Sequence, residues 1–510
     1  MAAILGSIIK RTIDIRGKIP HWKNPYKLQV KQLRKLLTKA QNTAFGQHYK
    51  FDRILLEDDI IKAYQKNVKI YDYSSIYKEW WHRSLKGEAY VCWPEQIKYF
   101  ALSSGTSEAS SKYIPVTKDM LKNFKKGSIR QMLAMAHYDL PKEHFQKGFL
   151  AIGGSTALDF NGTYYEGDLS GITAANIPTW FQHFYKPGKQ ISKYKDWDTK
   201  LSEIVKAAKD WDIGIIVGVP AWVQILMEKI IEHYKVKTIH DIWPNLRIYV
   251  HAGVSIAPYM KSISKLTRFP LIFSDTYLAS EGLIAFQERP NVEQGMRMLL
   301  DAGLFYEFVP FNESNFDGDG NIRPEAQALC IKEVEEGKEY ALLLSSCSGA
   351  WRYLIGDVVK FTSLEHSEIV ITGRTKHFLS LCGEHLSVEN MSKAISFTAE
   401  QMGIEINEFA VAGIPHGNLF AHHWYIGSNI KVSADALREK IDEHLKVIND
   451  DYRVERSSAL KEVIVTVLPD DAFIDFLASK GKLGSAHKFP RVMKGKQLEE
   501  WQEFIKKYQA

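Results

Sequence analysis

From Tyr99 onward, short apolar runs alternate with helix-like stretches, and this alternation limits the possible fold more than any other feature. The segments "GFLAIGG" and "LRIYVHAGV" are typical of buried strands, whereas "LSEIVKAAKDW" and "WVQILMEKIIEHY" have the apolar spacing of helices. Strands that alternate with helices of this length form βαβ units, in which helices cover a largely buried sheet. The sequence therefore predicts an α/β fold.

Two later regions depart from this pattern. Residues 304–371 contain strand-like segments such as "FYEFVPF" and "EYALLLSS" joined by turn residues, which predicts an antiparallel, partly barrel-like segment. The remaining residues alternate again, with the helix-like "SADALREKIDEHLKVI" between strand-like runs, which predicts a small α+β domain. We therefore expect a large domain over residues 1–375, containing the barrel-like segment, and a small domain over residues 376–510.

Charge and cysteine content exclude several classes of protein. The chain has 66 Lys plus Arg against 60 Asp plus Glu, a net charge of +6 over 510 residues, too small an excess to indicate nucleic-acid binding. Its four cysteines form no CxxC pair, which argues against a disulfide framework or a zinc ribbon. No apolar run approaches the roughly 20 residues that cross a bilayer, and the first residues lack the pattern of a secretory signal. We expect a soluble cytoplasmic protein without nucleic-acid or membrane partners.

A first candidate site lies in "KYFALSSGTSEASSKYIPVT", residues 98–117. A short apolar strand leads into Ser103, Ser104 and Thr106, and Lys112 follows a few residues later. Small residues let backbone N–H groups and hydroxyls converge on one point, and a nearby lysine adds positive charge, as phosphate oxygens require. The segment is not a Walker loop, so an ordinary Ser/Thr-rich surface loop remains the alternative.

A second candidate is "SDTYLASEG", residues 274–282, which follows the apolar run "PLIF". We expect it at the carboxyl end of a strand, where open α/β sheets bind ligands. Tyr277 offers an aromatic face, Ser280 a hydroxyl and Glu281 a hard oxygen ligand suited to magnesium. The alternative is a strand-to-helix turn in which the serine caps the helix.

Three further residues stand in loop or turn sequences nearer the carboxyl end. Asp357 lies in "WRYLIGD", where Gly356-Asp357 is either a hairpin turn or an acceptor for two ribose hydroxyls. Arg374, in "GRTK", is either a helix cap or a sugar-phosphate contact. Lys488 lies in the Gly/Ser/Pro-rich segment "GSAHKFPRVMKG", either as a solvated tail lysine or as a cation delivered to a site.

The order and spacing of these segments resemble the motif series of the acyl-adenylating superfamily, which includes acyl-CoA synthetases and luciferase. The chain is most similar to the Gretchen Hagen acyl-acid amido synthetases, the auxin-responsive, auxin- and jasmonate-conjugating family. Lys112 stands eight residues beyond Ser104 and three before Pro115, as in that family's "SSGTSxxxxKxxP". The segment "HKFPR" resembles its terminal "xKxPR" element, and the similarity extends from about Tyr99 to Arg491.

The resemblance implies an ATP site and a Mg²⁺ ligand. Ser103, Ser104 and Thr106 would hold the β- and γ-phosphates of ATP, and Ser280 would approach the α-phosphate. Glu281 would ligate Mg²⁺. Two departures are visible: Glu108-Ala109 replace the glycines expected after the phosphate loop, and "GRTK" resembles the wider superfamily more than the plant enzymes.

The resemblance also assigns the remaining residues and the architecture. Tyr277 would stack on adenine, and Asp357 would take the ribose hydroxyls with Arg374 nearby. Lys376 would lie at the hinge between the large domain and a mobile small domain, as in adenylate-forming ligases. Lys488 would neutralise charge where the carboxylate attacks the α-phosphate.

These roles imply an ATP- and Mg²⁺-dependent ligase that adenylates a carboxylic acid and passes the acyl group to an amine, an amino acid in this family. Joining two anions requires a cation and aimed donors in a cleft poor in water, and a hydrolysable adenylate requires a closing domain. Two alternatives remain open. One is an acyl-CoA ligase that uses coenzyme A as acceptor, and the other is a nucleotide- or acyl-binding protein without turnover.

Overall fold

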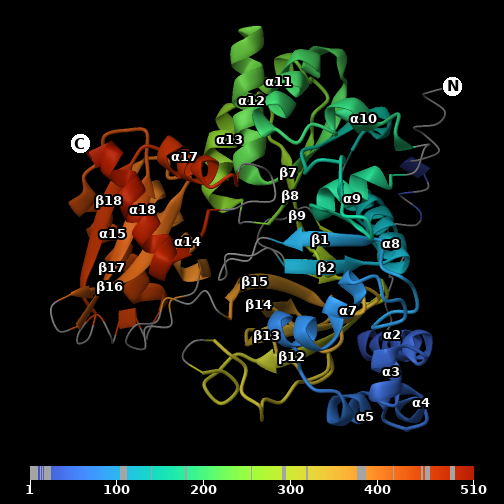
Figure 1. Ribbon diagram of the computed structural model, residues 1–510. Helices are drawn as coiled ribbons and strands as arrows, with labels where there is room; N and C mark the ends of the chain where they lie inside the picture. The colour runs from blue at the N-terminus through green and yellow to red at the C-terminus, as the bar shows by residue number, and fades with distance from the viewer. Residues whose placement is uncertain are drawn as a thin grey trace.

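The computed structural model describes most of the chain in two domains, a large one and a smaller carboxyl-terminal one, drawn in orange and red in Figure 1. It describes residues 10–11, 13, 15, 24–103, 112–138, 140–177, 181–253, 256–289, 295–317, 320–375, 379, 386, 388–416, 419–449, 452–453, 456, 460–482 and 489–509. Among these residues, no helix combines the length and the apolar character needed to span a bilayer.

The large domain is built on an 11-stranded sheet whose first half is parallel, in the order β9-β8-β7-β3-β6. These strands are β3 (Gly148–Ala151), β6 (Tyr185–Lys186), β7 (Ile213–Gly218), β8 (Ile248–Ala252) and β9 (Ile272–Ala279). The helices between them are α10 (Gly188–Ile191), α11 (Trp197–Ala207), α12 (Pro220–Tyr234) and α13 (Met260–Lys265), and the last three contribute buried apolar residues to a core shared with the sheet. The α/β fold predicted from the alternating pattern is confirmed.

The second half of the same sheet is antiparallel, as predicted for residues 304–371, and continues in the order β10-β11-β15-β14-β13-β12. Its strands are β10 (Gly282–Phe286), β11 (Met296–Met298), β12 (Leu304–Pro310), β13 (Glu339–Ser346), β14 (Tyr353–Ser363) and β15 (Glu368–Arg374). Because β15 pairs with β11, and β11 with β10, this segment extends the parallel sheet, and its described strands close no barrel.

A second, four-stranded sheet and the amino-terminal helices complete the large domain. The sheet has the order β2-β1-β5-β4. Its strands are β1 (Tyr99–Ser103), β2 (Lys112–Val116), β4 (Asp159–Phe160) and β5 (Tyr165–Gly167). The helices are α2 (Pro25–Ala40), α3 (Ala44–His48), α4 (Phe51–Ile54), α5 (Ile60–Asn67), α6 (Tyr73–Ile76), α7 (His82–Leu85), α8 (Lys118–Ala134) and α9 (Leu169–Ala175).

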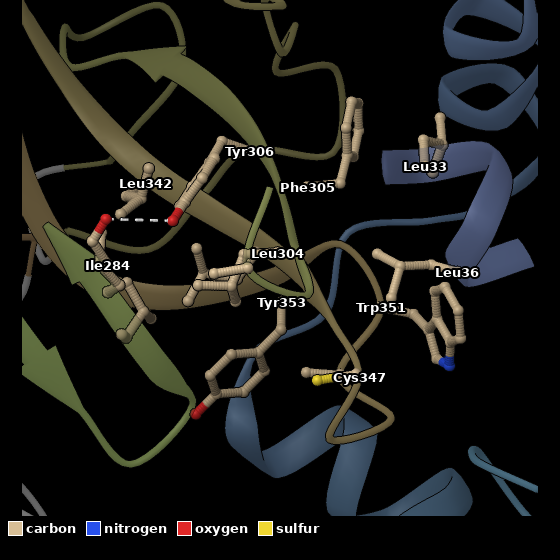
Figure 2. Packing of buried hydrophobic residues seen from close by; sticks show 14 of the residues in the cluster. Leu33, Leu36, Ile284, Leu304, Phe305, Tyr306, Leu342, Cys347, Trp351 and Tyr353 are labelled. Atoms are coloured by element: carbon tan, nitrogen blue, oxygen red, sulfur yellow. Dashed lines mark hydrogen bonds between the residues drawn. The ribbon is translucent and has the colours of Figure 1, made fainter. Parts of the chain in front are cut away.

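Helix α2 packs on the antiparallel half of the main sheet. Asn24 caps its amino end by accepting a hydrogen bond from the Lys27 amide at 2.9 Å, and Pro25 occupies the first turn. Leu33 and Leu36, spaced three apart, are buried in a core that includes Phe305 of β12 (Figure 2). This spacing places both leucines on the face of α2 that contacts the sheet.

The small domain is a four-stranded sheet with two layers of helices, in the order β18-β17-β16-β19. Its strands are β16 (Phe409–His416), β17 (Leu419–Gly427), β18 (Leu460–Leu468) and β19 (Val492–Met493). Helices α14 (Val388–Met402) and α15 (Ala434–Ile448) cover one face, whereas α17 (Asp471–Ser479) and α18 (Gly495–Gln509) share a separate core on the other. The predicted α+β character is confirmed, and the boundary at residues 375 and 376 stays a prediction.

A buried ion pair fastens the amino-terminal helices to the main sheet. The Arg352 guanidinium donates from Nε to both carboxylate oxygens of Glu307 at 3.1 Å, and from Nη1 to the carbonyls of Gln65 and Val68 at 2.9 and 2.7 Å. Both charged side chains are almost fully enclosed. The pair satisfies its own hydrogen bonds, as a buried charge requires.

Replacing Arg352 with Met should therefore be costly, because Glu307 would keep a buried charge without a cation beside it and with only the Gln65 amide donor recorded among the described residues. We expect Arg352→Met to lower the free energy of unfolding by about 3–5 kcal/mol in a denaturant titration. The exposed pair of Lys338 and Glu335 provides the control, and Lys338→Met should change the free energy of unfolding by less than about 1 kcal/mol. Equal effects of the two substitutions would contradict this assignment.

Candidate active site

Three polar residues from distant parts of the chain meet at one end of the main sheet. Tyr277 of β9 donates its hydroxyl to Asp357 Oδ2 of β14 at 2.5 Å. The other oxygen, Oδ1, lies 3.1 Å from Nε of Arg374, the last residue of β15. Arg374 also donates from Nη2 to the Ile355 carbonyl at 3.0 Å. A single carboxylate therefore joins a phenol and a guanidinium.

This meeting requires the sheet to curve. Asp357 and Arg374 are direct partners on adjacent strands, but β9 and β14 are separated by β10, β11 and β15. Four strand spacings of about 4.8 Å amount to roughly 19 Å along the sheet, far more than a tyrosine side chain spans. The hydrogen bond from Tyr277 to Asp357 therefore shows that the antiparallel half bends back over the end of β9. The segment expected to be partly barrel-like is thus curved, although its described strands form no closed barrel.

Asp357 lies inside strand β14, next to a β-bulge in the pairing of β14 with β13. On the β13 side the pairing jumps from Leu354 to Val358, which leaves Gly356 and Asp357 out of register. Gly356 has φ +90°, a conformation that favours glycine over residues with a Cβ. The hairpin-turn alternative for Gly356-Asp357 is therefore wrong, because the chain continues as the same strand on both sides.

Ser280 and Glu281 form the two-residue connection between β9 and β10. These strands are antiparallel neighbours, with Ala279 opposite Gly282, so the alternative of a strand-to-helix turn with a capping serine is wrong. The expected position at the carboxyl end of a strand is confirmed, since β9 runs parallel to β8 and ends immediately before Ser280. The pair thus follows Tyr277 directly at the same edge of the sheet.

Glu281 is a buried carboxylate, only 7% exposed. Its pKa is raised to about 7, chiefly by burial and also by the negative charge of Asp357, while a backbone hydrogen bond and the positive charges of Lys112 and Arg374 oppose the shift. The Tyr353 hydroxyl is a hydrogen-bonding neighbour of Glu281 and keeps its proton, since burial holds the pKa of this phenol well above its usual value. Glu281 therefore joins the Tyr277–Asp357–Arg374 group, together with Tyr353, which sequence reasoning missed although it lies in "WRYLIGD".

A residue that flanks the expected phosphate segment acts on the same group. Lys112 of β2 is the strand partner of Ser103, the last residue of β1, and its charge acts on Glu281. The end of the β1–β2 pair that carries Ser103 and Lys112 is therefore on the side of Glu281. The other residues expected in the site, Ser104, Thr106, Lys376 and Lys488, lie outside the described residues.

The arrangement suits one cation beside a polyanion. Glu281 is a buried carboxylate whose charged form is disfavoured by burial, so a nearby cation would stabilise it. Within the described ranges, no group of three or more His, Cys, Asp or Glu side chains has the geometry of a metal site. Magnesium is commonly bound by one or two carboxylates together with substrate phosphates rather than by an all-protein cage. The residues at this edge therefore fit a magnesium–phosphate ligand better than an isolated metal centre.

Comparison with known proteins identifies the family. Residues 21–157 match the GH3 family N-terminal domain, residues 297–374 the GH3 family central domain, and residues 389–497 the GH3 family C-terminal domain. Together these three ranges cover more than half of the chain, and they include Asp357, Arg374 and Lys488.

Curated relatives are similar over part of their length. The chain is 24% identical to indole-3-acetic acid-amido synthetase GH3.4 of Arabidopsis thaliana over 50% of this chain and 45% of that protein. It is 31% identical to jasmonoyl–L-amino acid synthetase GH3.5 of Oryza sativa subsp. japonica over 25% of this chain and 23% of that protein. In both cases the chain spans less than half of the relative.

Solved structures show the same fold over nearly the whole chain. The AtGH3.15 acyl acid amido synthetase in complex with 2,4-DB has a TM-score of 0.75 at 16% identity, over 94% of this chain and 93% of that chain. The 2-hydroxyisobutyryl-CoA ligase in the postadenylation state has a TM-score of 0.59 at 11% identity, over 96% of both chains. The large domain with a smaller carboxyl-terminal domain is therefore an arrangement shared with these two solved structures.

Proposed function

This chain is a member of the GH3 family, and we propose that it is an ATP-dependent ligase that joins a carboxylic acid to the amine of an amino acid. The acid is first adenylated with release of pyrophosphate, and the acyl group then passes to the amine. The observation that carries this proposal is the convergence of Tyr277, Glu281, Asp357 and Arg374 from three separate segments at one sheet edge.

The nucleotide is held by groups whose chemistry matches its parts. Asp357 accepts the ribose hydroxyls, because a carboxylate has acceptor sites beyond those used by Tyr277 and Arg374. Tyr277 presents its ring to adenine and retains its proton, since burial holds its pKa well above the usual value. Ser103, Ser104 and Thr106 provide the phosphate segment, and Ser280 lies beside the α-phosphate.

Glu281 is the residue that would hold Mg²⁺. When bound, this ion would neutralise phosphate charge and orient the leaving pyrophosphate. The chain's own contribution is to keep a carboxylate at the end of β9 in a site where burial strengthens electrostatic interactions. Lys112 and Arg374 supply positive charge on the same side.

The proposed reaction proceeds in two steps, adenylation of the acid and transfer of the acyl group to the amine. In the first, a carboxylate oxygen bonds to the α-phosphorus while the bond from that phosphorus to the bridging oxygen breaks, and pyrophosphate leaves. Two anions meet in this step, so a positive charge from Lys488 of the small domain lowers its barrier. In the second, the amine nitrogen bonds to the acyl carbon, the acyl–oxygen bond breaks, AMP leaves and the amine loses a proton.

The acceptor is an amino acid rather than coenzyme A in this proposal. The curated relatives bear the names of amido synthetases, and AtGH3.15 is named as an acyl acid amido synthetase.

The buried, unpaired cysteines Cys92, Cys330 and Cys347 agree with a cytoplasmic location, where thiols stay reduced.

The proposal is tested by acid-dependent exchange of labelled pyrophosphate into ATP across a panel of carboxylic acids. At least one acid should support exchange, and addition of amino acids with that acid should release AMP, whereas coenzyme A should not. Exchange followed by thiol-dependent AMP release would favour the acyl-CoA ligase alternative. ATP binding without exchange for any acid would favour a binding protein.

The nucleotide role of Asp357 predicts a selective defect. Asp357→Ala should raise the dissociation constant of ATP by roughly 10-fold or more, the effect of losing hydrogen bonds to a charged acceptor, while the dissociation constant of the acid stays nearly unchanged. Isothermal titration with each ligand separately measures both values. Equal weakening of ATP and acid binding would contradict the ribose assignment.

The charge role of Lys488 predicts a defect in chemistry. Lys488→Ala should lower the rate of pyrophosphate exchange by about 10²–10³-fold, the scale for losing one preorganised charge-stabilising contact. Lys482→Ala, a change in an exposed residue of the same domain, serves as the control and should retain the rate. An unchanged rate in Lys488→Ala would remove this residue from the mechanism.

A further inference from the structure

An aromatic side chain from the amino-terminal helices contacts the strand that carries Lys112. Tyr73, the first residue of α6, accepts a hydrogen bond on its hydroxyl from the Tyr113 amide of β2 at 2.8 Å. The Nζ atom of Lys112 lies 5.4 Å from the centroid of the Tyr73 ring, which is within the range of a cation–π contact. A single tyrosine therefore contacts the backbone of Tyr113 and the charged group of Lys112.

The Tyr113 amide needs an acceptor of this kind because β2 is an edge strand. Among the described strands of its sheet, β2 pairs only with β1, so every second amide of β2 points away from the sheet. An amide that lost water without gaining an acceptor would be costly. The Tyr73 hydroxyl provides the acceptor, and the hydrogen bond holds α6 against the edge of β2 next to Lys112.

The segment that bears Tyr73 is attached to the strand that bears Asp357. Two residues before Tyr73, the Tyr71 amide donates to the Arg352 carbonyl at 2.9 Å, and the Tyr71 carbonyl accepts from the Leu354 amide at 2.7 Å. Arg352 immediately precedes β14 and Leu354 lies within it, as does Asp357. Tyr73 therefore extends from a chain segment that is fixed to an element of the candidate site.

Lys112 belongs to the charge environment of that site. It is the strand partner of Ser103, and these two residues flank the expected phosphate segment. Its positive charge also acts on the buried Glu281 carboxylate. A lysine ammonium on its four-carbon stem has many conformations, and a contact that restricts them beforehand lowers the entropy cost of binding an anion.

We propose that Tyr73 is a positioning residue for Lys112 and holds its ammonium group where it meets the phosphates of ATP. The proposal rests on the proposed function, since it concerns one of the cations of the nucleotide site. Lys112 flanks the segment expected to bind the β- and γ-phosphates, so Tyr73 should affect only nucleotides that carry these groups. ATP carries them and AMP does not.

The test is Tyr73→Leu, which removes both the ring and the hydroxyl. In isothermal titration with Mg²⁺ present, the dissociation constant of ATP should rise by about 10-fold, the scale of a cation–π contact and a hydrogen bond, while that of AMP should change by less than about 2-fold. Tyr73→Phe keeps the ring and should raise the constant for ATP by only about 3-fold. An unchanged constant for ATP in Tyr73→Leu, or equal weakening of ATP and AMP, would overturn the proposal.

Tyr26 provides a matched control elsewhere in the large domain. It is half-buried, as Tyr73 is, and Nζ of Lys332 lies 4.2 Å from the centroid of its ring. This pair joins the start of α2 to the segment between β12 and β13. Tyr26→Leu should leave the dissociation constants of both nucleotides unchanged. A loss of ATP binding in Tyr26→Leu equal to that in Tyr73→Leu would reveal general loosening of the domain and overturn the proposal.

A double variant tests whether Tyr73 acts through Lys112. Lys112→Met removes the charge and should by itself weaken ATP binding. In that background, Tyr73→Leu should add less than about 2-fold to the dissociation constant, because no ammonium is left to position. The full loss in the Lys112→Met background would show that the two residues act independently and would also overturn the proposal. If Tyr73→Leu does not fold, Tyr73→Phe with and without Lys112→Met makes the same comparison.

Titration of the parent chain distinguishes failure of this proposal from failure of the proposed function. If the parent binds no ATP, the nucleotide site is wrong, and the proposed function and the role of Tyr73 fail together. If the parent binds ATP, and Tyr73→Leu binds it equally well, the nucleotide site stands and only the positioning role is overturned.

Discussion

The Asp357 carboxylate is the point on which the arrangement of the site depends. It accepts the Tyr277 hydroxyl on one oxygen and pairs with Arg374 on the other, so it ties the end of β9 to a strand four positions away in the sheet. The bulge at Gly356 shifts the register of β14 against β13 immediately before Asp357. Glu281 interacts electrostatically with Asp357 and Arg374, so the curvature of the sheet also determines the charges that surround bound phosphates in the proposed site.

A second carboxylate has a comparable part between the domains. Glu408 accepts hydrogen bonds from both domains, from the Tyr259 hydroxyl of the large domain and from the Arg491 guanidinium of the small one. The two carboxylates make different kinds of contact. Asp357 joins two donors within the main sheet, whereas Glu408 joins a donor of the large domain to a donor of the small domain.

Local pattern was sufficient to predict the elements that carry the site. The apolar spacing in "LSEIVKAAKDW" correctly predicted helix α11, and the run before Ser274 correctly predicted a strand whose carboxyl end bears Tyr277. Both signals come from periodicity within a single element, which is also what specifies the element physically. The resemblance then selected Asp357 and Arg374, which the structure brings together with Tyr277 and Glu281.

Pairing between distant segments could not be predicted in the same way. The residues "SE" before Gly282 are compatible with a helix cap or a tight hairpin, and only the β9–β10 register decides for the hairpin. The bulge at Asp357 arises from a mismatch between β13 and β14, which no local sequence signal shows. Arg352 would ordinarily be expected at the surface, and its burial follows from a Glu307 that is 45 residues away.

In the proposed reaction the bound acid attacks the α-phosphate of ATP. One oxygen of its carboxylate is thereby transferred to AMP, and an isotope label can follow this transfer. An acid that supports pyrophosphate exchange should be labelled with ¹⁸O in both carboxylate oxygens and turned over with ATP and an amino acid. Mass spectrometry of the products should find one ¹⁸O in AMP and none in pyrophosphate. Label in inorganic phosphate, with ADP as the nucleotide product, would show attack on the γ-phosphate and contradict the account.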